Sequence, residues 1–173
     1  MVKRTLALVC VLCAGLVSPA AAKDDRLVRF DGGIGVIPVS NITLNADGTV
    51  NTVSKNVVRG VNPPGQIWTI ARLRAQVNTD GSIEVDGRGL LLAGGNNIGL
   101  NANQSVFATL ICSAAAPFTQ FSTPTAGVPL APNGDFHIAD MLSPTPPSPC
   151  ASPVLLIRNP AGAWFAAGIL KLN

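Results

Sequence analysis

Turn-forming residues interrupt this 173-residue chain about every ten residues, and this spacing limits the fold more than any other feature. Asp-Gly, Asn-Gly and Pro-rich breaks separate short apolar runs, and no segment has a convincing helical period. Short strands at such spacing are typical of β-sandwiches and β-barrels. The sequence therefore predicts an all-β, single-domain antiparallel sandwich or closed barrel of about 8–10 strands with one disulfide.

The clearest predicted element is a hairpin over residues 66–93, in which NTDG forms the turn. Both flanking segments alternate between apolar and polar residues, which indicates one buried and one wet face. The predicted buried face carries Ile67, Ala71, Leu73, Ala75, Val77, Ile83 and Val85. The predicted wet face carries Arg72, Arg74, Gln76, Glu84, Asp86 and Arg88. Because the arginines and the acids lie on neighbouring strands, we expect charge pairing between those strands.

The glycine-rich stretch over residues 83–101, IEVDGRGLLLAGGNNIGLN, has two interpretations: a cradle for a phosphate, or strand ends and a tight turn. A P-loop needs glycines followed by Gly-Lys-Ser/Thr and a helix, and a dinucleotide site needs a βαβ unit. Neither context is present. We therefore predict a bulge or close backbone approach at Gly87 and Gly89, and a turn at AGGNNIG.

One further strand is predicted to be interior. The segment QSVFATLICS (104–113) places Phe107 and Ile111 on one face and Val106 and Leu110 on the other. Each large apolar side chain stabilises the fold by about 1.5–3 kcal/mol when fully buried. A two-layer sandwich buries only one face of each sheet, so something must cover the second face: a folded-back loop such as the Pro-rich segment tied at Cys150, a barrel ligand or another subunit.

Other segments complete the predicted domain. The turn NADGT (45–49) separates strands at NITL and TVNTVSKNVVRG, and it resembles NTDGS (78–82) as one turn type used twice. GDFHIADML (134–142) alternates, and PVLLIRN and AWFAAGILKL form a closing hairpin around PAG. SPTPPSPCASP (143–153) contains five prolines, so we expect an extended surface loop anchored at Cys150.

The N-terminus has the order of a secretory signal peptide over residues 1–22. Lys3 and Arg4 precede an apolar run that is too short to span a bilayer, and the small residues before Lys23 fit a cleavage site near Ala22. We expect the protein to be exported, as a secreted or periplasmic or cell-surface protein, with residues 23–173 as one domain. An N-terminal anchor and lipidation at Cys13 are the alternatives.

Signal removal changes the cysteine and charge counts. Cys112 and Cys150 remain, and one pair in an exported chain predicts a disulfide rather than a metal pair. Ten basic and nine acidic residues remain, so the mature net charge is +1. No basic cluster suits nucleic acid, and no later segment is long and apolar enough for a transmembrane helix.

The candidate catalytic residues are Asp135 and His137, which point to the same side of a strand. A carboxylate beside an imidazole can orient a general base for a serine nucleophile. No Gly-x-Ser-x-Gly turn accompanies them, so the preferred interpretation is the solvent face of an amphipathic strand. His137 is the only histidine, which excludes multi-histidine metal sites, and no cofactor is expected.

Three other signals have ordinary structural interpretations. Glu84 is the only glutamate, and its neighbours continue the wet face instead of forming a carboxylate pair for glycoside hydrolysis. The Asp-Gly turns lack an EF-hand loop. Asn41 and Asn103 match the N-glycosylation pattern, whose use depends on the host. Of Trp68 and Trp164, at least one is expected to be buried rather than to stack on sugars.

No motif in the sequence identifies a family. The preferred hypothesis is a non-catalytic exported β-domain, either a binding module or an interaction and structural module. The first alternative is a small secreted hydrolase that uses Asp135 and His137. The second is a β-barrel that holds an apolar ligand, since several strands are apolar on both faces. The partner is open between a second copy of the chain and an apolar ligand.

Overall fold

The computed structural model describes residues 25–172, which form thirteen strands and no helix. The predicted signal peptide and its cleavage site lie outside these residues. The strands are β1 (Arg26–Gly35), β2 (Val39–Leu44), β3 (Val50–Lys55), β4 (Trp68–Thr69), β5 (Arg72–Asn78), β6 (Ser82–Arg88), β7 (Leu91–Leu92), β8 (Ser105–Ile111), β9 (Gln120–Ser122), β10 (Val128–Pro129), β11 (Phe136–Met141), β12 (Val154–Arg158) and β13 (Trp164–Leu170). The described part of the chain contains no helix that could cross a membrane.

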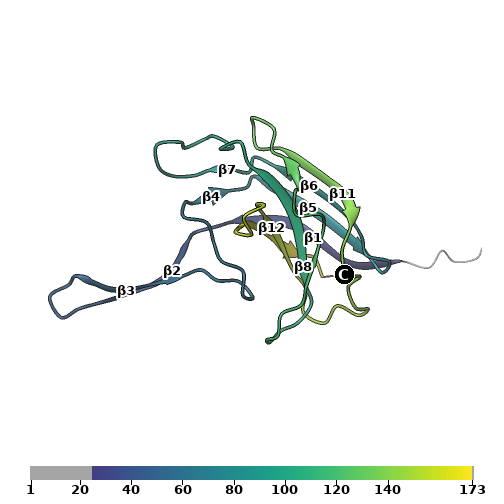
Figure 1. Ribbon diagram of the computed structural model, residues 1–173, viewed down its shortest axis with the longest axis horizontal. Coiled ribbons are helices and arrows are strands. Elements are labelled where there is room, and N and C mark those ends of the chain that lie inside the picture. The colour runs from purple at the N-terminus through teal and green to yellow at the C-terminus, as the bar shows by residue number, and fades with distance from the viewer. Residues whose placement is uncertain (1–24, 173) are drawn as a thin grey trace, which may run out of the picture.

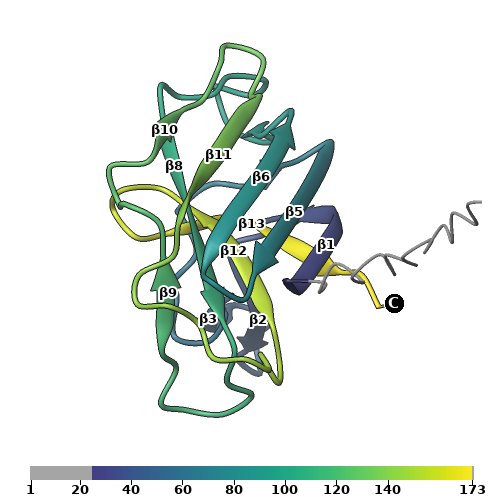
Figure 2. The ribbon, with the colours of Figure 1, turned by 90° about the vertical axis from the view of Figure 1, so that its right-hand side faces the viewer.

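Nine of these strands form one antiparallel sheet that nearly closes into a barrel (Figures 1 and 2). Its order is β10-β8-β12-β13-β1-β5-β6-β11, with β9 also paired to β8. The two ends of this order, β10 and β11, lie next to each other without a ladder. The predicted all-β antiparallel class is therefore confirmed, and the barrel alternative describes it better than the sandwich.

A bulge in β1 helps to curl the sheet. The first half of β1 pairs with β5, and the second half pairs with β13. The register with β13 shifts between Phe30 and Gly33, where Gly32 adopts a φ of +107°. A bulge of this kind increases local twist and lets one strand take part in two differently oriented parts of a sheet.

The barrel interior is filled by the apolar faces that the alternation predicts for β5 and β6, whereas Ile67 and Ala71, which were also predicted to be buried, are exposed before β5 begins. On β5 and β6 the pattern alternates residue by residue between buried and exposed. The interior residues from this side of the barrel are Val28, Phe30, Leu73, Ala75, Val77, Ile83, Val85, Phe136 and Ile138. Gly87 belongs to this row because a Cβ there would overlap the Phe136 ring, so the predicted close approach is present.

On the opposite side of the barrel, β8, the middle of β12 and the first three residues of β13 are buried on both faces. Six consecutive residues of β8 from Val106 to Ile111 are buried, as the sequence predicts for an interior strand. The guanidinium of Arg158 lies 5.1 Å from the centre of the Phe107 ring, and burial lowers the pKa of this arginine. The Thr109 hydroxyl hydrogen-bonds the Ser122 hydroxyl at 2.9 Å.

Folded-back loops supply the rest of this outer cover. The segment over residues 56–70 contacts β13, where Trp164 donates its indole N–H to the Asn56 carbonyl at 3.0 Å. Arg59 donates to the Ser152 carbonyl at 2.9 Å, beside the loop that holds Cys150. Of the three covers that the sequence allowed, the structure shows loops of the same chain.

The predicted disulfide joins Cys112, at the end of β8, to Cys150 in the Pro-rich loop. The two cysteines are 38 residues apart, and the Ser152 N–H also donates to the Cys112 carbonyl at 3.0 Å. The loop that precedes Cys150 contains no strand and is mostly exposed. The bond therefore adds a covalent link to the hydrogen bonds that hold this surface loop against the barrel wall.

Candidate functional site

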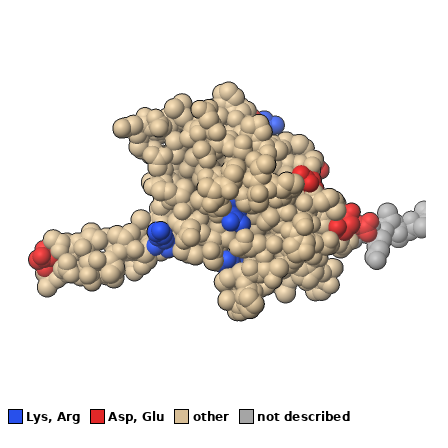
Figure 3. Space-filling model, in the orientation of Figure 1, with Lys and Arg blue, Asp and Glu red and all other residues tan. Residues whose placement is uncertain are grey.

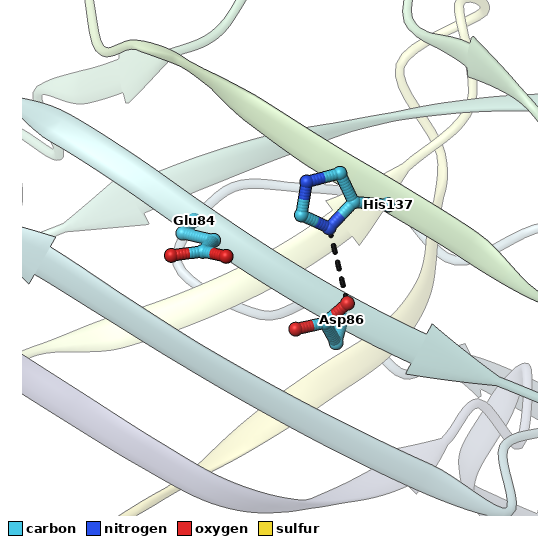
Figure 4. A group of neighbouring side chains, drawn as sticks. All are labelled: Glu84, Asp86 and His137. Atoms are coloured by element: carbon cyan, nitrogen blue, oxygen red, sulfur yellow. Dashed lines mark hydrogen bonds and ion pairs between the residues drawn. The ribbon is translucent and has the colours of Figure 1, made fainter.

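The sole histidine lies in a row of exposed polar side chains on the wet face of β6 and β11. Alternation along β6 turns Glu84 and Asp86 outward, and the β6–β11 register places His137 directly opposite Asp86. The His137 Nδ1 is 3.0 Å from the Asp86 Oδ1 (Figure 4). One ligand atom from each of these three residues lies within 4.8 Å of the other two.

Carboxylates and an imidazole at this spacing could supply ligands to a divalent cation, or orient the imidazole as a base. The side chains of His137 and Asp86 are 53% and 60% exposed, so water competes for every polar atom and screens the pair. Such clusters are common on wet sheet faces without a bound ion. The cluster alone therefore indicates neither a metal site nor a catalytic base.

Asp135 lies just before β11 on the same wet face as His137, but its carboxylate has other partners. The Gly89 N–H and the Asn133 amide donate to it at 3.1 and 3.0 Å, and Arg88 forms an ion pair at 3.2 Å. Thus the structure brings His137 together with Asp86, whereas Asp135 fixes the end of β6. The two candidate catalytic residues do not form a hydrogen-bonded pair with each other among the described contacts.

The charge pairing predicted between β5 and β6 is not found among the described residues, because their arginines pair with acids outside this hairpin. Arg74 lies opposite Asp86 in the β5–β6 register, yet its Nε is 3.3 Å from Asp31 Oδ1 on β1. Lys171 reaches the other oxygen of Asp31 at 3.3 Å. The Lys171 hydrogen bond, together with the charges of Lys171 and Arg74, lowers the pKa of Asp31. Arg74 thus links β5 to β1, and Lys171 links the segment after β13 to β1. The pairs of Asp86 and Asp135 link β6 to β11 and to the residue before it.

Both tryptophans are buried, at 4% and 3% exposure. Trp68 stacks on Phe165, and the Trp164 indole N–H is used by the Asn56 carbonyl. Neither ring offers a face to solvent, so the sugar-stacking interpretation has no support. The prediction that at least one tryptophan is buried is confirmed.

The least expected feature is a two-stranded arm, β2 and β3, that projects from the barrel (Figure 1). Every residue of both strands is exposed. Ile42 lies opposite Val53, and Leu44 lies opposite Val50, so these four side chains share one side of the ribbon. With Val39 at the base they form what we call the arm's apolar face. Its five side chains are 43–58% exposed.

The opposite side of the arm is polar. The Thr43 and Thr52 hydroxyls hydrogen-bond across the strands at 2.6 Å, and Asn41 and Ser54 lie in the same polar row. At the far end, the Asp47 Oδ1 accepts the Thr49 hydroxyl and N–H at 2.6 and 3.0 Å, and these bonds lower the pKa of Asp47. The arm is therefore an amphipathic hairpin with a well-formed turn.

Hydrogen bonds anchor the base of the arm to the barrel. The Asn56 N–H donates to the Pro38 carbonyl at 2.8 Å, and its side-chain amide donates to the Ile37 carbonyl at 2.9 Å. The Asn56 carbonyl in turn accepts the Trp164 indole N–H. One residue thus links the two ends of the arm to each other and to the barrel.

The sequence predicted strands on both sides of NADGT but not their exposure. The alternation through Ile42 and Val53 resembles that through Ile83 and Val85, which are buried. Local pattern shows which side of a strand is apolar, but it does not show what covers that side. Whether the rest of the chain covers a strand depends on the tertiary structure, and no residue near Ile42 or Val53 shows that the arm is left uncovered.

Comparison with known proteins adds no relative: no protein-family model matches this chain, and neither a curated protein nor a solved structure shows significant similarity to it.

Proposed function

We propose that this chain is an exported, non-catalytic interaction module whose binding element is the β2–β3 arm. The observation that carries the proposal is the arm's apolar face, in which five large side chains are 43–58% exposed on a ribbon that pairs with no other strand of residues 25–172. Large apolar side chains that are exposed next to one another mark interaction sites on folded proteins. The export half of the proposal rests on the N-terminal pattern and the disulfide.

The barrel suits the role of a platform. Its core is packed on all sides by its own strands and loops, and the disulfide and Arg59 fasten those loops. The arm contributes nothing to that core, because all of its residues are exposed. A protein that needed only a stable barrel would gain nothing from this hairpin, so the hairpin's benefit lies in what it contacts.

Two alternative functions have less support. A hydrolase that uses Asp135 and His137 needs the carboxylate to orient the imidazole, but Asp135 is bonded to Arg88, Gly89 and Asn133. An apolar-ligand barrel needs interior space, but apolar side chains from the surrounding strands occupy the interior. No specific observation favours either alternative over the arm.

Site-specific photo-crosslinking tests the binding role of the arm. A photoreactive residue at Val53 would lie on the apolar face, and the same residue at the adjacent Ser54 would lie on the polar face. In the cells that produce the protein, we expect adducts from position 53 and few from position 54. Absence of adducts at both positions, or equal yields, would contradict the proposal.

Export has its own test. Protein recovered outside the cytoplasm should begin at Lys23 by N-terminal sequencing, because the small residues end at Ala22. Exported material that keeps Met1 would contradict the signal-peptide part of the proposal and leave the binding part intact.

A further inference from the structure

A charged residue lies at each end of the arm's apolar face. Asp47 lies in the turn at the outer end, and it is the only acidic residue of the arm. Lys55 ends β3 at the inner end, where it lies opposite Val39. Figure 3 shows acidic atoms at the tip of the arm and basic atoms where the arm meets the barrel. The five apolar side chains lie between these two charges.

Lys55 is available to an outside partner. Its side chain has no ion pair or hydrogen bond to any part of the chain that the structure describes. It lies two residues after Val53 on β3, so it points to the apolar side of the ribbon. A charge at the margin of an apolar patch is typical of a rim, where it sets orientation and partner choice.

The distribution of residues argues against a lipid surface as the partner. The turn that would enter a membrane first, NADGT, is polar and carries Asp47. The apolar side chains lie along the flank, over roughly 15 Å of ribbon at about 3.3 Å per residue. A flank of this shape fits the flat face of another sheet better than the interior of a bilayer.

A second copy of the same arm offers a partner with a matching apolar flank, a positive charge for Asp47 and a negative charge for Lys55. When two arms pack with their apolar faces together and their directions opposed, the tip of each arm lies at the base of the other. Asp47 of each copy then approaches Lys55 of its partner, twice per dimer, around a two-fold axis. Closed two-fold pairing of one self-complementary patch is the commonest form of homo-oligomer.

We propose that this protein forms a two-fold homodimer through its β2–β3 arms, packed face to face and antiparallel. This inference rests on the proposed function and names its partner. The polar row with Asn41 and the Thr43–Thr52 hydrogen bond stays in water, so a glycan on Asn41 would not obstruct the contact. The interface is small, so the dissociation constant is expected in the micromolar range.

Charge reversal with mixing tests this arrangement. The exported protein is studied by analytical ultracentrifugation across the micromolar range as wild type, Asp47→Lys and Lys55→Asp. Each variant places like charges together twice in its own dimer, so each dimer should weaken by about tenfold. An equimolar mixture of the two variants places opposite charges together at both contacts. The mixture should therefore regain association close to that of the wild type.

Asp80→Lys is the matched control. Asp80 holds the β5–β6 turn through Ser82 as Asp47 holds the arm turn through Thr49, but it lies on the barrel. This variant should dimerise like the wild type. Damage to the arm turn in Asp47→Lys would persist in the mixture, so recovery on mixing separates a charge contact from a local folding defect.

Each other outcome overturns the inference. A wild type that stays monomeric, or one whose mass grows beyond two copies, contradicts the two-fold dimer. A dimer that ignores both charge reversals places the contact elsewhere. Crosslinks from Val53 to a different protein, with a monomeric wild type, would retain the interaction module and reject the second copy as its partner. A monomeric wild type that also gives no crosslinks from Val53 would reject both the interaction module and the homodimer.

Discussion

Two hairpins in this molecule share a turn but differ in what covers them. The arm turn NADGT and the β5–β6 turn NTDGS both use an aspartate that accepts hydrogen bonds from the residue two positions later. Both place the following glycine at positive φ, +82° for Gly48 and +90° for Gly81. The apolar side chains of β5–β6 are at most 5% exposed, whereas those of the arm are at least 43% exposed.

This difference shows that the formation of a hairpin has local causes, whereas the burial of its apolar face has tertiary causes. Turn chemistry and alternation suffice to specify a hairpin, and they do so equally in both places. Burial requires a second surface, which β1, β11 and the barrel core provide for β5–β6. An isolated two-stranded hairpin is marginal in water, so the arm gains from any surface that covers its apolar face. The following predictions test whether the two hairpins differ as described.

The largest contrast is expected from an aspartate on each apolar face. Val85→Asp buries a carboxylate in the barrel, where Val85 is 0% exposed, and should cost on the order of 5 kcal/mol. Ile42→Asp leaves its carboxylate in water and should change barrel stability by less than about 0.5 kcal/mol. Urea unfolding followed by the fluorescence of Trp68 and Trp164 reports the barrel alone. Equal losses in the two variants would contradict the comparison.

Removal of the disulfide should have the next largest effect, and again on the barrel only. Its 38-residue loop restricts the unfolded chain by up to about 4 kcal/mol on the chain-entropy model. Cys112→Ser with Cys150→Ser should lower the urea midpoint accordingly. The dimer dissociation constant of the folded variant should stay unchanged, because neither cysteine touches the arm. A large shift in that constant would show that the barrel and the arm are coupled.

Alanine substitutions of the two turn glycines, Gly81 and Gly48, should differ less in their effect on barrel stability. Alanine at a left-handed position costs about 1–2 kcal/mol, since its Cβ crowds the following carbonyl. Gly81→Ala should therefore destabilise the barrel by this amount. Gly48→Ala should leave barrel unfolding unchanged, although it strains the arm turn in the same way. Thermal unfolding of the two variants side by side distinguishes these outcomes, and a loss in Gly48→Ala would place the arm inside the cooperative unit.

The smallest expected effect is on the stability of the barrel at acidic pH. Hydrogen bonds from the Ser82 N–H and hydroxyl lower the pKa of Asp80 below its ordinary value of 3.8, so the ionised form stabilises the folded barrel above that pH. This contribution is lost as the pH falls through the lowered folded value. Asp80→Asn should flatten the acid limb of barrel stability, whereas Asp47→Asn should not. A titration of melting temperature below pH 4 provides the comparison.

Much of the barrel could be predicted from the sequence, because the signals that specify its strands lie within short segments of the chain. Alternation identified the buried faces of β5 and β6, two cysteines left one pairing, and continuous apolarity marked β8 as interior. Pairings between distant strands were not predictable. The Asp86–His137 contact depends on the β6–β11 register, and no short-range pattern near either residue encodes it. The exposure of Ile42 depends on the absence of a covering strand, which alternation cannot show.

Hydrogen exchange of the backbone amides, measured across a range of protein concentration, tests the central claim most directly. Barrel amides of β5, β6 and β8 should be protected at every concentration, because global unfolding controls them. Arm amides should exchange rapidly in dilute protein and slow as the concentration passes through the micromolar range, where a second copy covers them. Arm amides that are protected even in the most dilute samples would show that the chain itself buries the arm. Arm amides that never gain protection would show that no second copy covers it.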